Sequence, residues 1–120
     1  MLRHFRQRKS IKQFVKHLPL DLARRNGERR HYSLDEVTTA VKGGPYDAAF
    51  LAYAHALFCT RRDFDACYQP LKLRTSYDSL RAKVARRFFE GVCTFDAASL
   101  IRFAKGTESD SYYESGLGEI

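Results

Sequence analysis

The sequence predicts an all-α domain, a compact bundle of about five helices. Apolar residues recur at helical spacing along most of the 120-residue chain, and hydroxyl or acidic caps precede several of these segments. No stretch alternates polar and apolar residues as a half-buried strand would. We expect one helical domain over residues 1–106, followed by an acidic tail over residues 107–120.

The first helix is expected over residues 3–18, with an inward stripe formed by Ile11, Phe14, Val15 and Leu18. Pro19 should stop or kink this helix, because a proline ring clashes with the preceding turn of a helix interior. A short turn of helix should follow from Leu20 to Arg25. It should end at Asn26-Gly27, which is a common C-terminal signal.

The central part of the chain has clear helix starts. Ser33 and Glu36 form a capping box, which predicts a helix from Leu34 to the Gly43-Gly44-Pro45 turn. Residues 46–59 are apolar nearly all round, which is typical of a central buried helix. A short helix is expected over 60–68, and a loop containing Pro70 over 69–74.

Two more helices and a tail complete the prediction. Thr75 and Ser76 offer hydroxyl caps for a helix with one apolar side and with Lys83, Arg86 and Arg87 on the other. Thr94 is expected to cap a last helix over 95–105, which Gly106 should end. Residues 107–120 are rich in Ser, Gly and acids, so we expect a mobile tail there.

Positive charge is concentrated in the N-terminal quarter. Residues 1–31 hold ten Lys and Arg against two acids, a formal charge of +8, whereas residues 107–120 hold four acids and no Lys or Arg. Such polarity attracts anionic partners but identifies no reaction. The candidate anion-binding residues are Arg3, Arg6, Arg8, Lys9, Lys12, Lys16, Arg24, Arg25, Arg29 and Arg30.

The N-terminal helix is basic and amphipathic. On a helical wheel Phe5, Lys9, Lys12 and Lys16 share the face opposite the apolar stripe. The plainest interpretation of such a face is a solvated surface. Its cations can also neutralise phosphates or carboxylates, and the exposed ring can stack on a base, enter a lipid surface or anchor a protein. The candidate apolar anchors are Phe5, Tyr112 and Tyr113.

We therefore predict a non-catalytic adaptor that binds a protein partner or another acidic surface through its basic N-terminal region. A nucleic-acid-binding protein without sequence specificity is the alternative, and a homodimer joined through Leu2 and Phe5 is a third. The segments 34–42 and 46–59 have the spacing of a helix-turn-helix, but the second lacks base-reading side chains. We also consider that the acidic tail masks the basic region.

No enzyme, metal or cofactor is predicted. The motifs GxxxxGK[ST], GxGxxG, HExxH and GxSxG are absent, and the four histidines are scattered. His55 and Cys59 have the spacing of half a metal site, but no second close pair of ligands follows.

The location predicted for the protein is cytoplasmic. Three cysteines without a CxxC motif favour a reducing compartment. The N-terminus lacks the apolar segment of a secretory signal, and no apolar run approaches the about 20 residues of a membrane span. We therefore expect no integral membrane segment.

Overall fold

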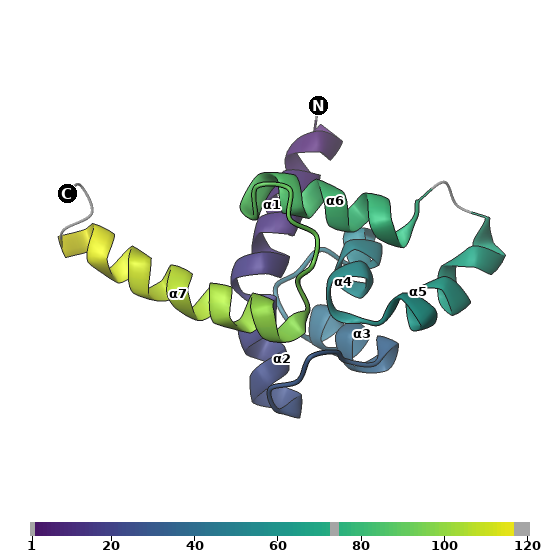
Figure 1. Ribbon diagram of the computed structural model, residues 1–120, viewed down its shortest axis with the longest axis horizontal. Coiled ribbons are helices and arrows are strands. Elements are labelled where there is room, and N and C mark those ends of the chain that lie inside the picture. The colour runs from purple at the N-terminus through teal and green to yellow at the C-terminus, as the bar shows by residue number, and fades with distance from the viewer. Residues whose placement is uncertain (1, 73–74, 117–120) are drawn as a thin grey trace.

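The computed structural model describes the backbone of residues 2–72 and 75–116 and the side chains of residues 3–72 and 75–106. These residues contain no strand, so the predicted all-α class is confirmed, although with seven α-helices instead of about five (Figure 1). In chain order the elements are α1 (Leu2–Lys16), α2 (Leu18–Asn26), α3 (Leu34–Gly43), the 3-10 helix η1 (Ala48–Phe50), α4 (Leu51–Phe58), α5 (Arg61–Tyr68), the 3-10 helix η2 (Gln69–Leu71), α6 (Tyr77–Phe88) and α7 (Ala97–Gly116).

Helix α4 lies at the centre of the molecule. It contacts α1, α3, α5 and α6, and every side chain from Tyr53 to Phe58 is buried, as expected for this apolar segment. The α-helix is shorter than the predicted 46–59 because it begins only at Leu51. Before it, the Asp47 carboxylate accepts a hydrogen bond from the Ala49 amide (3.0 Å) and starts the tighter helix η1.

Helices α1 and α2 meet at a single-residue break. His17 lies between them, and Pro19 stands in the first turn of α2, where the missing N–H of a proline would have no partner in any case. The proline therefore helps to start a helix, and the first helix ends at Lys16, short of the predicted end. The inward stripe of this region is confirmed, since all four of its members are buried: Ile11, Phe14, Val15 and Leu18.

Side-chain caps set the starts of the later helices. Ser33 and Glu36 form the predicted capping box at α3, and Thr60 and Ser76 cap α5 and α6. At α7 the cap is Asp96, not Thr94. The Asp96 carboxylate accepts from the Ser99 amide (2.9 Å) and the Ser99 hydroxyl accepts from the Asp96 amide (3.2 Å), a reciprocal arrangement for which Thr94 has no matching partner.

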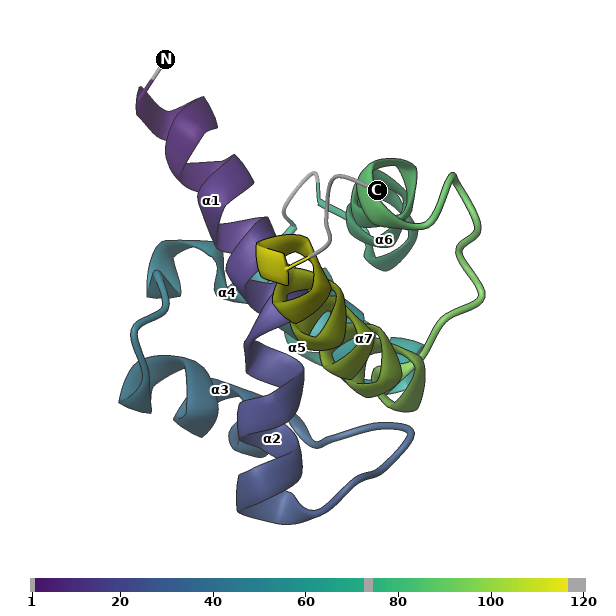
Figure 2. The same cartoon turned by 90° about the vertical axis from the view of Figure 1, so that its left-hand side faces the viewer.

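Helix α7 packs against α1 and α2 and then continues past them (Figures 1 and 2). Leu100, Ile101 and Ala104 are buried on its inner side. The helix ends at Gly116, so its predicted end at Gly106 is wrong. A single glycine inside a helix costs only about 1 kcal/mol and does not end it. The backbone of 107–116 is therefore helical, while the side chains of this segment lie outside the described ones.

The core contains a cation that the sequence did not predict. Arg81 on α6 is 7% exposed, and its guanidinium donates to the carbonyl oxygens of Ala56 (2.9 Å), Cys93 (3.3 Å) and Phe95. It also lies 5.0 Å from the ring centroid of Tyr77 and 4.0 Å from that of Phe95. Arg81 thus pairs a carbonyl that the end of α4 leaves without a helical partner, and joins α4 to the segment before α7.

Candidate anion-binding surface

The outer side of α1 carries the predicted row of cations. Phe5, Lys9, Lys12 and Lys16, which we call the α1 ridge, recur at helical spacing and leave the helix opposite the buried stripe. Phe5 is 67% exposed, Lys9 and Lys12 are exposed, and Lys16 is partly exposed. With about 1.5 Å of rise per residue the ridge is roughly 16 Å long.

The first turns of α1 extend beyond the neighbouring helices (Figure 2). None of the side chains from Arg3 to Lys9 is buried, and Ser10 is the first that is. The side chains that form the N-terminal half of the α1 ridge are therefore open to solvent and can be reached by a large partner.

Four of the ten candidate cations are already paired within the protein. These ion pairs are Arg6–Asp47 (2.7 Å), Arg24–Asp21, Arg29–Glu36 (2.8 Å) and Arg30–Asp96 (3.3 Å). Three of them connect segments that are distant along the chain or fasten the start of a helix. These arginines therefore serve the fold, and their charge is largely balanced inside it.

Three of the acids in these pairs, Asp47, Glu36 and Asp96, are held in their charged form. The Arg6 guanidinium lowers the pKa of Asp47, and the Ser33 amide followed by Arg29 lowers the pKa of Glu36. Burial opposes ionisation of Asp96, but hydrogen bonds from Ser99 and Arg30 outweigh it and leave the pKa lowered. The pairs that these three acids form consequently persist at neutral pH.

The other six candidate cations have no ion pair with any acid whose side chain is described: Arg3, Arg8, Lys9, Lys12, Lys16 and Arg25. All except Arg25 lie on α1. Arg25 packs against Gly43 of α3, where an added Cβ would come within 3.1 Å of a guanidinium nitrogen. Unpaired positive charge is thus concentrated on α1, whereas the cluster around residues 24–30 is mostly used in internal pairs.

Helix α6 adds a cation beside α1 that sequence spacing did not place there. The Arg87 guanidinium donates to the Arg8 carbonyl (2.8 Å) and lies 4.9 Å from the Phe88 ring centroid. Burial, and then the charge of Arg8, lower the pKa of Arg87. Two like charges are therefore held close together where α1 meets α6, which strengthens the local positive potential.

The candidate apolar anchors differ in what the structure says of them. Phe5 is one of three large apolar side chains that are strongly exposed among the described residues, together with Leu71 and Val92. Tyr112 and Tyr113 lie in the part of α7 whose side chains are outside the described ones, and so does the side chain of Leu2. The two tyrosines and masking by the acidic segment therefore stay predictions.

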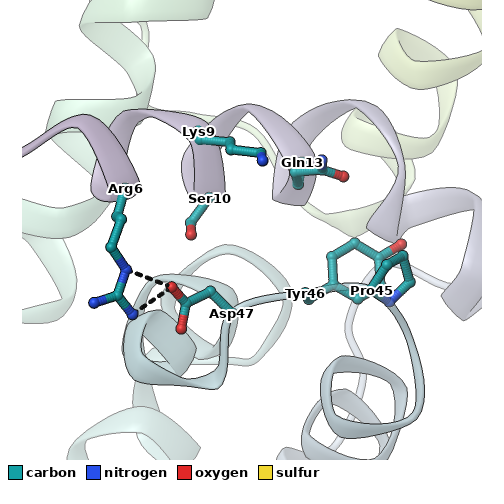
Figure 3. A pocket seen from close by; sticks show the side chains of 7 residues that line it. All are labelled: Arg6, Lys9, Ser10, Gln13, Pro45, Tyr46 and Asp47. Carbon is teal, nitrogen blue, oxygen red and sulfur yellow. Dashed lines mark hydrogen bonds and ion pairs between the residues drawn. The ribbon is translucent and has the colours of Figure 1, made fainter. Parts of the chain in front are cut away.

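A cleft of about 370 Å³ lies between α1 and the turn that precedes η1 (Figure 3). Helix α1 contributes Arg6, Lys9, Ser10 and Gln13, and the turn contributes Pro45, Tyr46 and Asp47. We call it the α1 cleft. The sequence predicted Arg6 and Lys9 as candidate residues but did not predict the α1 cleft, because the Arg6–Asp47 ion pair that closes one side of it joins positions 41 residues apart.

His55 and Cys59 are both buried in the core of the protein. His55 Nε2 lies 2.8 Å from Thr38 Oγ1 and Nδ1 lies 2.7 Å from Tyr68 Oη, so both ring nitrogens have partners. Burial lowers the pKa of His55 and raises the pKa of the Cys59 thiol to about 12. Among the residues with described side chains, no group of three or more His, Cys, Asp or Glu is placed to hold a metal ion.

The arrangement offers amines, a guanidinium pair and polar donors around α1, a chemistry suited to binding oxyanions. No helix in the described ranges is both long and apolar enough to span a membrane. Searches of curated proteins and of solved structures found no match. A family model matches residues 2–118, a range that includes α1, the cleft and α7, and its description names no activity. The chain therefore belongs to the Family of unknown function (DUF6559).

Proposed function

We propose that the protein is a non-catalytic interaction module that binds an acidic surface of a protein partner through the α1 ridge. The observation that carries this proposal is the alignment of Lys9, Lys12 and Lys16 with the exposed ring of Phe5. The amines attract an acidic surface from a distance, and an aromatic ring is the kind of anchor that fixes position in a protein interface.

The number of unpaired cations favours a protein partner over a nucleic acid. Affinity for nucleic acid grows with the number of phosphates neutralised, and internal ion pairs engage Arg6, Arg24, Arg29 and Arg30. Non-specific nucleic-acid binding remains the second candidate function. It is favoured by the position of Arg87 beside Arg8, which widens the positive surface from α1 toward α6.

The proposal includes no catalytic step, metal or cofactor, because the ridge consists of amines and a phenyl ring. It also places the protein in the cytoplasm, where its three cysteines, all free, would stay reduced. Pairing of two copies through Phe5 is a competing use of the same exposed ring.

Fluorescence anisotropy of the full chain with labelled probes tests the proposal. The probes are a Glu-rich peptide, single-stranded DNA and duplex DNA, each at low and near-physiological salt. The ridge variant is Lys9→Ala/Lys12→Ala/Lys16→Ala. The matched control, Lys42→Ala/Arg62→Ala/Arg102→Ala, removes the same charge from exposed positions on α3, α5 and α7.

We expect the ridge variant to bind the peptide about tenfold or more weakly, and the control variant to lose no more than about threefold. Phe5→Ala should weaken peptide binding further. Equal losses in the two triple variants would contradict a role for the ridge. Tighter binding to DNA with a steep salt dependence would select the second candidate function. A doubled mass in light scattering that Phe5→Glu abolishes would identify a homodimer instead.

A further inference from the structure

We propose that the α1 cleft binds a carboxylate side chain of the acidic partner. This inference rests on the proposed function and deepens it: the ridge attracts the partner by charge, and the cleft recognises one carboxylate by hydrogen bonds. The two sites adjoin because Lys9 belongs to both the ridge and the lining of the cleft.

Three polar side chains that line the cleft, those of Lys9, Ser10 and Gln13, make no hydrogen bond or ion pair to any described residue. Ser10 is only 5% exposed and points from α1 into the cleft (Figure 3). Its hydroxyl makes no hydrogen bond to any described residue, and neither does the Gln13 amide or the Lys9 amine. No enclosed side-chain nitrogen or oxygen in the described ranges lacks a partner, so the Ser10 hydroxyl is reached from the cleft and is not sealed in the core.

Gln7, on the same helix, differs from Gln13 because its side-chain amide has a hydrogen-bond partner within the protein. Its side chain donates to the Tyr53 hydroxyl at 2.7 Å and so ties α1 to α4. On α1, Gln13 follows Lys9 by four residues and Ser10 by three, and both spacings place side chains next to each other on a helix. The Lys9 amine, the Ser10 hydroxyl and the Gln13 amide therefore line the same cleft.

The remaining polar side chains around the cleft already have hydrogen-bond partners within the protein. Asp47 accepts from Arg6 with one carboxylate oxygen (2.7 and 3.1 Å) and from the Ala49 amide with the other (3.0 Å). The Tyr46 hydroxyl donates to Asp21. These contacts hold the far wall in place, and neither oxygen of Asp47 is left without a donor.

The charge of the cleft matches a carboxylate. Arg6 and Asp47 balance each other, so Lys9 supplies the one unbalanced charge of the lining. A carboxylate carries a single negative charge, whereas a phosphate monoester carries about −1.5 to −2 at neutral pH. A carboxylate also accepts several hydrogen bonds at once, as the donors of Lys9, Ser10 and Gln13 require. The volume of about 370 Å³ lies within the range of small-ligand sites.

A charge-neutral variant separates the cleft from the ridge. Ser10→Ala/Gln13→Ala removes two donors but leaves the net charge and every lysine in place, so long-range attraction is unchanged. The probe is a labelled peptide of Glu residues, and the full chain is used throughout. Lys9→Ala is compared with Lys12→Ala, a matched pair in which one of two adjacent ridge lysines lines the cleft and the other does not.

We expect the double variant to bind the Glu peptide about tenfold more weakly, because two hydrogen bonds to a charged group are lost. Lys9→Ala should lose several-fold more affinity than Lys12→Ala. In ¹⁵N-labelled protein, the Gln13 side-chain amide signals and the backbone amide signals of Tyr46 and Asp47 should shift saturably with the peptide. An unchanged circular dichroism spectrum shows that each variant is folded.

The outcomes distinguish the two proposals. Wild-type affinity of the double variant, together with equal losses for Lys9→Ala and Lys12→Ala, would overturn the cleft while leaving the ridge intact. Unchanged affinity of the triple ridge variant would overturn the proposed function itself. Tighter binding of a phosphoserine peptide that depends on Ser10 and Gln13 would show a phosphate site and overturn the carboxylate assignment.

Discussion

The cations of this protein lie in two contrasting environments. Lys9 and Lys12 on α1 are exposed, while Arg81 in the core is 7% exposed, and none of them has a carboxylate partner among the described side chains. Arg81 has exchanged its water for backbone carbonyls and two aromatic faces, whereas the lysines keep their water and can exchange it for a partner. What replaces the hydration of a cation therefore decides whether it stabilises the fold or offers a binding surface.

Of the substitutions proposed, that of the buried cation Arg81 should have the greatest effect. Arg81→Met should lower the free energy of unfolding by about 2–4 kcal/mol, because buried carbonyls, among them those of Ala56 and Phe95, lose their donor. Urea unfolding followed by circular dichroism measures this loss, and binding of the Glu peptide by the folded variant should be unchanged. Arg81→Lys should restore little of this stability, since an ammonium group cannot reproduce the planar set of N–H donors of a guanidinium. A loss below about 1 kcal/mol for Arg81→Met would refute this role.

His55 offers a third case, a basic group that is buried in its neutral form. Burial lowers its pKa, although the Leu34 backbone and the charge of Asp35 oppose the shift. The unfolded chain then binds a proton more readily than the folded protein below the ordinary His pKa of about 6.5. Stability should fall as pH drops from about 6.5 toward the lower pKa of the folded state, and should be unaffected by this group above that range.

Urea unfolding of wild-type protein and His55→Gln across this pH range tests the expectation. Because only the change with pH is compared, a general destabilisation by the substitution does not confuse the result. The variant should show a shallower pH dependence, and equal slopes would contradict the assignment to His55.

The smallest expected effect concerns the exposed ion pairs. The Arg30 side chain is 84% exposed, so Arg30→Ala should change the free energy of unfolding by no more than about 0.5 kcal/mol. Asp96→Ala should cost about 1 kcal/mol, because it also removes the cap of α7. Thermal unfolding of the two variants compares these effects. A larger loss for Arg30→Ala than for Asp96→Ala would show that the pair matters more than the cap.

The sequence predicted features that depend on neighbours in the chain. The predicted caps at Ser33 and Ser76 and the predicted apolar stripe of α1 are confirmed, because each follows from residues three or four positions apart. The predicted end of α7 at Gly106 is wrong, because one glycine seldom outweighs the helix-forming residues around it.

The candidate site was only partly predictable. The order of cations along α1 follows from helical spacing, but which of them are paired does not. Arg6 meets Asp47 across 41 positions and Arg30 meets Asp96 across 66. Tertiary packing likewise creates the α1 cleft and brings the carbonyl groups to Arg81. Neither feature can be predicted from the spacing of residues along the chain.

Three polar contacts hold the solvent-exposed turns at the start of α1: Arg6 to Asp47, Gln7 to Tyr53 (2.7 Å) and the Arg8 carbonyl to Arg87 (2.8 Å). Apolar packing adds little there, since no described side chain before Ser10 is buried, and a segment held in this way opens locally at low free energy. Ionic strength therefore acts twice on this helix. Salt screens the lysines, and it also weakens the exposed Arg6–Asp47 tether that keeps them in register. Ionic strength thus sets both the attraction between the lysines and an acidic partner and the order of the start of α1. Binding through α1 should therefore respond to salt more steeply than screening of the lysines alone would cause.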